Sequence, residues 1–116
     1  MPTRIAAALV AVLAILCASC LPALAETCRA SWYGAAHHGR TMANGKPFDM
    51  HRLTAAHRSW PFGTPVRVTY GGKSVVVTIT DRGPYAGGRC IDLSRAAAAQ
   101  IGMTRAGVGT VTINRL

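Results

Sequence analysis

The sequence predicts a mainly β domain, folded as a small closed barrel with one short α-helix. Short segments of strand-forming residues alternate with glycine- and proline-rich turns, and only one segment near the C-terminus has the composition of a helix. The chain has 116 residues, with no internal repeat and no low-complexity linker. A small isolated sheet exposes two unpaired edges, and closure into a barrel removes both of them.

The first 25 residues are typical of a secretory signal peptide, so we expect the mature domain to span residues 26–116. Arg4 supplies the positive charge, residues 5–16 are apolar, and Ala23-Leu24-Ala25 has the small residues of a cleavage site. Cleavage there would leave 91 residues, enough for one small domain, which we expect to be a monomer.

The apolar segment also bears on localisation. It is too short, and too soon interrupted by Pro22, to form a stable membrane span. We therefore expect export to the periplasm or out of the cell, with a lipid anchor on Cys20 as the alternative. Two cysteines would remain, and in an exported domain of this size Cys28 and Cys90 predict one disulfide that closes a loop of about 60 residues. Two buried thiols are the alternative.

The mature domain is strongly basic. Loss of Arg4 changes the formal charge from +9 to +8, and only four carboxylates remain. Such a charge attracts polyanions. We do not expect nucleic acid as a partner, because an exported protein rarely meets it. An anionic polymer of the cell envelope is the expected partner, and a merely solvated basic surface is the alternative.

The first half of the domain is expected to contain one strand and a long loop. Residues 29–33 have the aromatic character of a strand. Residues 35–48 predict a loop, because they contain two histidines, the turn signal Asn44-Gly45 and Pro47. Residues 53–57 are a short apolar run, followed by a proline-rich turn.

A hairpin is expected next. Residues 66–70 alternate between apolar and polar side chains, and Gly71-Gly72 is a plausible two-residue loop into a second strand at residues 74–80. Gly83-Pro84 then forces the chain out of the sheet. Asp81 is therefore expected at the end of a strand, at the mouth of the barrel.

The C-terminal part predicts the helix and a last strand. Ser94 is a good N-cap for a helix at residues 95–101, which Gly102 would end. Residues 107–114 predict the last strand. Asp92 is expected to be structural and to accept hydrogen bonds from backbone amides at the start of the helix.

Acid–base chemistry has few possible locations in this chain. Asp49, His57 and Asp81 fall at loop or strand-end positions, and we expect them to line one groove. A carboxylic acid beside aromatic residues can have a raised pKa, as a general acid needs, and glycosidic bond cleavage often uses such acids in pairs. The structural alternatives are a turn capped by Asp49 and a contact of Asp81 with Arg82 or a turn amide.

No metal or cofactor is expected. His37, His38 and His51 do not have the spacing of metal ligands with a further cysteine or histidine. The glycines at 83, 87 and 88 do not form a phosphate-binding loop, because no lysine and helix follow them in the required order.

Together these segments resemble the rare lipoprotein A (RlpA) family, over essentially all of residues 29–115. The matching blocks, in order, are Ala30-Ser31-Trp32-Tyr33-Gly34, His38-Gly39-Arg40-Thr41, Ala43-Asn44-Gly45, Phe48-Asp49-Met50, Thr54-Ala55-Ala56-His57, Pro61-Phe62-Gly63-Thr64, Val66-Arg67-Val68, Asp81-Arg82-Gly83-Pro84 and, after Arg89, Ile91-Asp92-Leu93-Ser94. The resemblance implies a six-stranded double-psi β-barrel, related to expansins and barwin-like proteins. It also implies endolytic lytic transglycosylation of peptidoglycan glycan strands, with 1,6-anhydro-muramyl products.

The resemblance implies a role for each matching polar residue. Asp81 would be the general acid, and then the base while the muramic acid 6-hydroxyl attacks the anomeric carbon. Asp49 and His57 would stabilise the positive charge of the transition state or orient the substrate. The residues expected to contact the sugars are Trp32, Tyr33, Arg82 and Tyr85.

One position departs from the family pattern. The family has Gly-Glu-x-x-Asp before its first acid, whereas this chain has Gly45-Lys46-Pro47-Phe48-Asp49. A non-catalytic barrel that binds or loosens cell-wall glycan, as expansins do, is therefore the alternative to an active enzyme.

Overall fold

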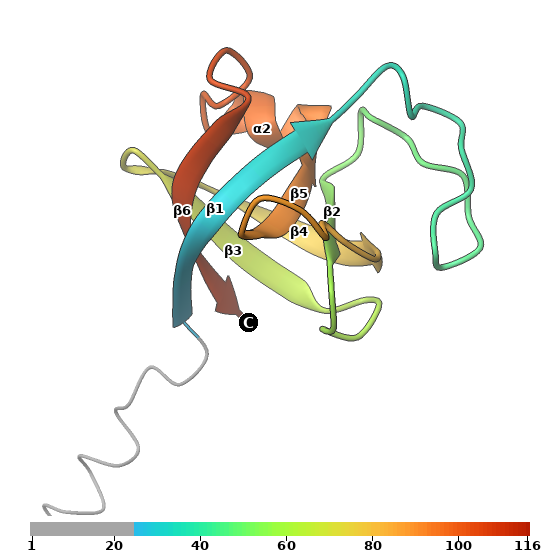
Figure 1. Cartoon of the computed structure of the whole chain (residues 1–116), viewed down its shortest axis with the longest axis horizontal. Helices are drawn as coiled ribbons and strands as arrows, with labels where there is room; N and C mark the ends of the chain where they lie inside the picture. Colours follow the sequence, from blue (N-terminus) through green and yellow to red (C-terminus); the bar gives the residue numbers. More distant parts are fainter. Residues whose placement is uncertain (1–24) are drawn as a thin grey trace, which may run out of the picture.

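Six strands of the chain close into one barrel, with a short helix packed against it (Figure 1). The computed structural model describes residues 25–116. The order of strands around the barrel is β1-β5-β2-β4-β3-β6, and β6 pairs back to β1. The elements are β1 (Ala25–Tyr33), β2 (Thr54–His57), β3 (Pro65–Tyr70), β4 (Lys73–Asp81), β5 (Arg89–Ser94), α2 (Arg95–Gln100) and β6 (Val108–Arg115).

This architecture confirms the predicted mainly β fold with one short helix. The expected signal peptide and the alternative anchor at Cys20 fall on residues outside the described part, apart from Ala25, which begins β1. Within residues 25–116, no helix has the length and apolar character that crossing a membrane requires.

Strand β1 is longer than the sequence suggested. It begins at Ala25 rather than Arg29, because its first residues pair antiparallel with β6, from Ala25 opposite Asn114 to Ser31 opposite Val108. Its second half pairs in parallel with β5. Strand β1 therefore closes the barrel, because it pairs with β5 on one side and with β6 on the other.

The expected hairpin is present between β3 and β4. Tyr70 pairs with Lys73, so Gly71 and Gly72 form a two-residue loop. Their φ angles are +53° and +80°, a region where glycine is favoured and which the type I′ hairpin turn requires at both positions.

Strand β5 was not predicted from the residue pattern. It runs parallel to β1 on one side and antiparallel to β2 on the other, so Ile91 and Leu93 are fully buried inside a six-residue strand. Its pattern is obscured because a glycine turn precedes it and the helix follows directly. Ser94 is both its last residue and the N-cap of α2, where its side chain accepts a hydrogen bond from the Ala97 amide.

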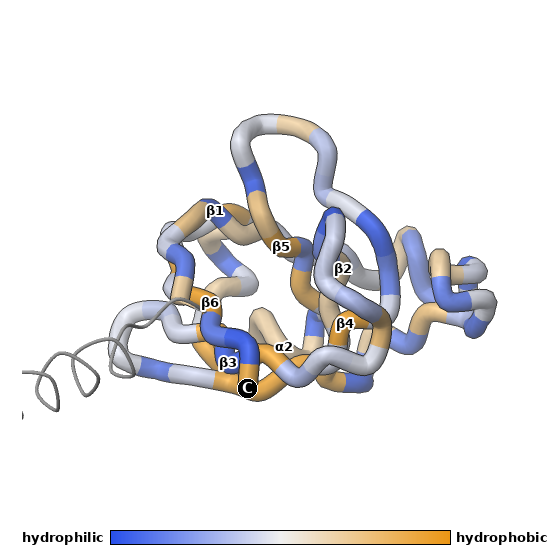
Figure 2. The backbone as a smooth tube through the Cα atoms, turned by 90° about the horizontal axis from the view of Figure 1, so that it is seen from below, coloured by the Kyte–Doolittle hydropathy of each residue, from blue (hydrophilic) through white to orange (hydrophobic). Residues whose placement is uncertain are grey.

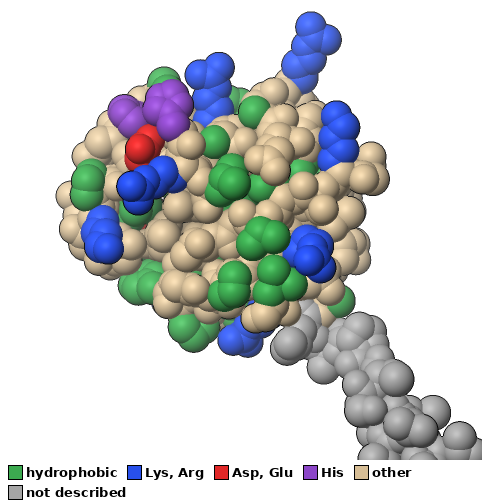
Figure 3. All heavy atoms as spheres, turned by 180° about the vertical axis from the view of Figure 1, so that it is seen from behind, with side chains coloured by type: hydrophobic (Ala, Val, Ile, Leu, Met, Phe, Trp, Pro, Cys, Tyr) green, Lys and Arg blue, Asp and Glu red, His purple; other side chains and the backbone are tan. Residues whose placement is uncertain are grey.

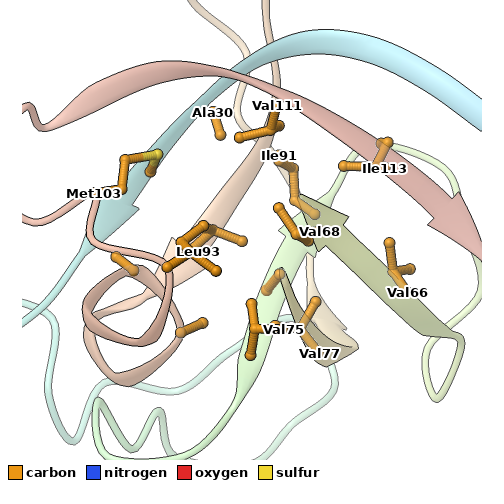
Figure 4. Close-up of a cluster of buried hydrophobic side chains, with 14 of the residues drawn as sticks. Ala30, Val66, Val68, Val75, Val77, Ile91, Leu93, Met103, Val111 and Ile113 are labelled. Atoms are coloured by element: carbon orange, nitrogen blue, oxygen red, sulfur yellow. The ribbon is translucent and has the colours of Figure 1, made fainter. Parts of the chain in front are cut away.

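The barrel interior is filled by aliphatic side chains from all the long strands. Alternate residues of the hairpin point inward, and the helix contributes Ala97 and Ala98. Figure 2 shows apolar stretches of β3, β4 and β6 gathered around the barrel. The side chains that meet in the close-up of Figure 4 include Ala30, Val66, Val68, Val75, Val77, Ile91, Leu93, Met103, Val111 and Ile113.

A disulfide joins Cys28 of β1 to Cys90 of β5, with 5.9 Å between their Cα atoms. This confirms the predicted pairing. The bond lies where the parallel pairing of β1 and β5 begins, so it links the N-terminal strand to the segment that the residue pattern left unassigned.

The long loop between β1 and β2 projects from one side of the barrel (Figure 1). Its tip is a tight turn in which Gly45 has a φ angle of +85° and the Lys46 amide donates to Asn44 Oδ1 at 3.0 Å. The loop is fastened to the barrel by Phe48, which is buried against the Tyr33 ring at 4.4 Å between centroids.

Candidate functional site

A hollow of about 330 Å³ lies where the long loop meets the end of the barrel, and we call it the Asp81 hollow. Its lining comes from five segments of the chain: Tyr33 at the end of β1, residues of the long loop between 37 and 48, Ala56 in β2, residues 81–85 at and after the end of β4, and Asp92 in β5. Two of the four carboxylates in residues 25–116 therefore share one hollow.

Asp81 is the last residue of β4, as predicted. Its Oδ1 accepts hydrogen bonds from the amides of Ala43 and Arg82, both at 2.8 Å. Within residues 25–116 the structure shows no donor to its Oδ2. One oxygen is thus fixed by backbone amides, and the other remains for a proton or a ligand.

Asp92 faces the same hollow from β5. In the barrel, Ala56 of β2 is paired with Asp81 on one side and with Asp92 on the other. Paired residues on neighbouring strands project from the same face of a sheet, so the two acids lie on either side of a small side chain.

The prediction that Asp92 accepts hydrogen bonds from backbone amides at the start of the helix is wrong. Its Oδ1 instead accepts a hydrogen bond from Ser31 Oγ at 3.0 Å, because residue 92 is inside a strand and not in the turn before the helix. Burial raises the pKa of Asp92, and the charge of Asp81 acts in the same direction, against the Ser31 hydrogen bond and the charge of Arg89.

Asp92 is the residue of the Asp81 hollow that sequence reasoning did not place there. The signal that could have identified it was its place among only four carboxylates, with Asp81 in the same short stretch. Its position opposite Ala56 depends on strand register between segments far apart in sequence, which no local pattern reveals.

Tyr33 closes one side of the Asp81 hollow. Its ring packs against Phe48 and meets the His37 ring edge-on at 5.5 Å. Burial raises the pKa of Tyr33, and the charges of Asp81 and Asp92 add to this effect, so the hydroxyl keeps its proton. That buried hydroxyl has no hydrogen-bond partner in the described part of the chain.

Arg82 and Tyr85 form the rim. The Arg82 guanidinium donates to the carbonyls of His57 at 3.2 Å and Trp60 at 2.9 Å, and it lies 4.0 Å from the centre of the Phe62 ring. These contacts fix its position beside Asp81. Tyr85 is 77% exposed and leaves a flat ring open to solvent.

His57 does not join this group, so the prediction of one groove is wrong for it. It lies in a separate depression beside Glu26 and Arg58. Ala56 faces the Asp81 hollow, and successive side chains of a strand point to opposite faces, so His57 points away.

The contacts of His57 are those of a structural residue. Its Nδ1 accepts hydrogen bonds from the amides of Ser59 at 3.2 Å and Trp60 at 3.1 Å, and its ring stacks on Trp60 at 4.2 Å. Burial lowers the pKa of His57, and the charges of nearby arginines lower it further.

The same alternation separates Trp32 from the Asp81 hollow. Its neighbour Tyr33 lines that hollow, whereas Trp32 lines another hollow beside Arg95 and Arg105. Its place is fixed closely by Gly34, where an added Cβ would come within 2.9 Å of the indole. The structure therefore does not bring Trp32 to the two carboxylates.

Asp49 lies in a second hollow of about 390 Å³, which we call the Lys46 hollow. Met42 lines both hollows, so they adjoin. Asp49 Oδ1 accepts a hydrogen bond from the His51 amide at 2.9 Å, and its Oδ2 lies 4.0 Å from Arg52 Nε. Asp49 thus caps its own turn and stands beside the Asp81 hollow, not in it.

Among residues 25–116 there is no group of three or more histidine, cysteine, aspartate or glutamate side chains arranged to hold a metal ion. The chemistry available in the Asp81 hollow is that of two carboxyls, a protonated phenol and a fixed guanidinium.

Comparison with known proteins gives concordant results. A family model described as "Lytic transglycolase" matches residues 25–113. The probable endolytic peptidoglycan transglycosylase RlpA of Synechocystis sp. is 58% identical over 87 residues, which are 73% of this chain and 27% of that protein. The endolytic peptidoglycan transglycosylase RlpA of Vibrio cholerae is 49% identical over 90 residues, which are 76% of this chain and 34% of that protein. The match thus spans about a third or less of these relatives' length.

Solved structures with the same fold include the Streptomyces papain inhibitor, with a TM-score of 0.66 and 25% identity over 81% of this chain and 96% of that chain. An apo expansin of Clavibacter michiganensis gives a TM-score of 0.64 and 24% identity over 79% of this chain and 50% of that chain. These neighbours share the barrel.

Proposed function

The chain belongs to the lytic transglycolase family, and we propose that its barrel is an endolytic peptidoglycan lytic transglycosylase. The observation that carries the proposal is the placement of Asp81 and Asp92 in one hollow, on either side of Ala56. Glycosidic cleavage often uses paired carboxyls beside the scissile bond.

Asp81 is the proposed general acid. Because amides hold its Oδ1, its Oδ2 is the oxygen that carries the proton to the glycosidic oxygen. As the bond from that oxygen to the anomeric carbon breaks, positive charge develops on the sugar. The 6-hydroxyl of the same muramic sugar then attacks the anomeric carbon and gives its proton to Asp81. The products are a free sugar hydroxyl and a 1,6-anhydro end, and no water is consumed.

The other residues of the Asp81 hollow orient the substrate in this proposal. Burial raises the pKa of Asp92, and its carboxyl is placed in the hollow to form a hydrogen bond with a sugar hydroxyl. The Tyr33 hydroxyl is a donor. Tyr85 offers an exposed face on which a sugar ring can stack, and Arg82 keeps the Asp81 backbone in place.

Export to the cell envelope is part of this proposal. The disulfide is the kind of bond that forms outside the cytosol, and the basic surface suits an anionic envelope polymer. Peptidoglycan glycan strands are the proposed partner, met in the periplasm or beyond by a monomer.

Product analysis tests the proposal. Purified peptidoglycan glycan strands are incubated with the protein, and the new ends are identified by mass spectrometry. Transglycosylation gives 1,6-anhydro-muramyl ends, which are lighter by one water than the ends that hydrolysis leaves. Hydrated ends only, or no new ends, would contradict the proposal. Binding of the strands without new ends would favour a barrel that holds glycan, a reading motivated by Lys46 beside Asp49.

A further inference from the structure

We infer that the Lys46 hollow is an anion subsite, which binds the carboxylate of a sugar next to the bond that is cleaved. The inference rests on the proposed function for the identity of the polymer. In peptidoglycan glycan, the sugar that bears a carboxylate is muramic acid, whose lactyl carboxylate is free wherever no peptide is attached. The Lys46 hollow would therefore select glycan by charge, beside the hollow where the chemistry occurs.

Position is the first argument. Met42 lines both hollows, and its neighbour Ala43 donates its amide to Asp81. A strand that places its scissile bond at Asp81 can therefore run on past Met42 into the Lys46 hollow. The long loop forms one wall of each hollow, which keeps the two at a fixed spacing.

Charge is the second argument. Lys46 and Arg52 are the two cations of this hollow, and Asp49 is its single carboxylate. Asp49 is occupied by the His51 amide and by Arg52, and its pair with Arg52 is long, with side chains 45% and 80% exposed. Such an exposed pair is weak, so Arg52 remains able to bind an anion. Within the described chain the structure gives Lys46 no ion pair.

The third argument is an unused hydroxyl. Thr54 is one of the residues that line the Lys46 hollow, and its Oγ1 is buried and has no hydrogen-bond partner in the part of the chain that the structure describes. A buried polar group without a partner is costly, and a ligand that accepts its proton would remove the cost. A carboxylate accepts hydrogen bonds only, and so it suits Thr54 together with the two cations.

The backbone around Lys46 is rigid enough for recognition. The Lys46 amide donates to Asn44 Oδ1, and its carbonyl accepts from the Met42 amide at 2.8 Å. A bridge between Thr41 and Pro47 closes this turn. Lys46 is thus carried on a short, hydrogen-bonded turn whose residues line the hollow.

The chain contains its own matched control. Lys73 is the second of its two lysines, and it lies at the start of β4 beside the Gly71-Gly72 turn. Replacing either lysine by methionine removes one positive charge and keeps a similar length. In Figure 3, basic side chains are spread over the visible face of the molecule, so a non-specific charge effect would be similar for both lysines.

The test measures binding without turnover, in the Asp81→Asn background. The probes are peptide-free glycan strands with their lactyl carboxylates intact, and the same strands after chemical reduction of those carboxylates to alcohols. Lys46→Met should weaken binding of the intact strands about fivefold, and leave binding of the reduced strands unchanged. Lys73→Met should leave the binding of intact and of reduced strands unchanged. In the Asp81→Asn protein that keeps both lysines, added salt should reduce the preference for intact over reduced strands.

Equal effects of Lys46→Met and Lys73→Met, or equal affinity for intact and reduced strands, would overturn the inference. Its failure is distinguishable from failure of the proposed function, which the protein with Asp81 intact tests by formation of anhydro ends. Anhydro products with no dependence of binding on Lys46 would support the proposed enzymatic function and contradict the anion subsite. A Lys46-dependent preference for intact strands without anhydro products would support the anion subsite and contradict the proposed enzymatic function.

Discussion

Asp81 and Asp92 are both partners of Ala56, one through the parallel pair of β2 with β4 and the other through the antiparallel pair of β2 with β5. The two acids are 11 positions apart in the sequence, yet a whole strand lies between their strands in the barrel. The arrangement exists because β2 is inserted between β4 and β5. It places two carboxyls in one hollow with only a methyl side chain between them.

The raised pKa of Asp92 predicts a pH-dependent cost in stability. The folded protein holds this proton more tightly than the unfolded chain, whose carboxyl has its ordinary pKa of 3.8. The free energy of unfolding should therefore fall as pH rises from 3.8 through the raised pKa of the folded state. Asp92→Asn should lack this decline and should gain stability relative to wild type as pH rises. Urea unfolding of both proteins over this range is the measurement, and parallel curves would contradict the assignment.

The lowered pKa of His57 predicts the opposite slope at higher pH. The unfolded chain takes up this proton near pH 6.5, and the folded protein does so only at lower pH. Stability should therefore be complete above about pH 6.5 and should be lost as pH falls through the folded pKa. Protonation also removes the acceptor that Nδ1 offers to the amides of Ser59 and Trp60.

His57→Asn should reduce this dependence, because asparagine does not titrate and its side-chain oxygen can still accept from an amide. Thermal unfolding of the variant and of wild type at several pH values measures the difference. His51, which is exposed and outside the barrel strands, is the matched control, and His51→Asn should leave the wild-type profile unchanged. If His51→Asn alters the pH dependence of stability and His57→Asn does not, His57 is not the group responsible.

The disulfide should contribute substantially to the stability of so small a domain. It closes a loop between residues 62 positions apart and joins β1 to β5. Replacing Cys28 and Cys90 together by serine should lower the free energy of unfolding by about 2–4 kcal/mol. Thiol titration of the denatured, unreduced mature protein should find no free thiol, and two free thiols would contradict the pairing.

Local patterns were sufficient to predict the elements that depend on local chemistry. The Gly71-Gly72 hairpin, the Ser94 cap and the end of a strand at Asp81 are all set by residues adjacent in sequence. Strand β5 was not predicted because its six residues lie between two neighbouring strands and run directly into the helix cap. Its strand character comes from pairing partners far away in the chain.

Only part of the candidate site was predictable, because the rest depends on the pairing of strands that are distant in sequence. Asp81 could be placed at a mouth of the barrel from its own neighbours. The separation of His57 and Trp32 from Asp81 follows from which face each strand turns inward, and this depends on register. The pairing of Asp92 with the site depends on β2 lying between β4 and β5, which no local signal shows.

The central claim is that Asp81 donates the proton that breaks the glycosidic bond. The most direct test is the rate of anhydro-muramyl product release by wild type, Asp81→Asn and Glu26→Gln at equal concentrations of folded protein. Glu26→Gln makes the same change from acid to amide in β1, outside the Asp81 hollow, and should keep the wild-type rate. Asp81→Asn keeps the size of the side chain and an acceptor for the amides of Ala43 and Arg82, and should lower the rate by about 10²–10⁴-fold. A folded Asp81→Asn variant that releases product at the wild-type rate would contradict the account.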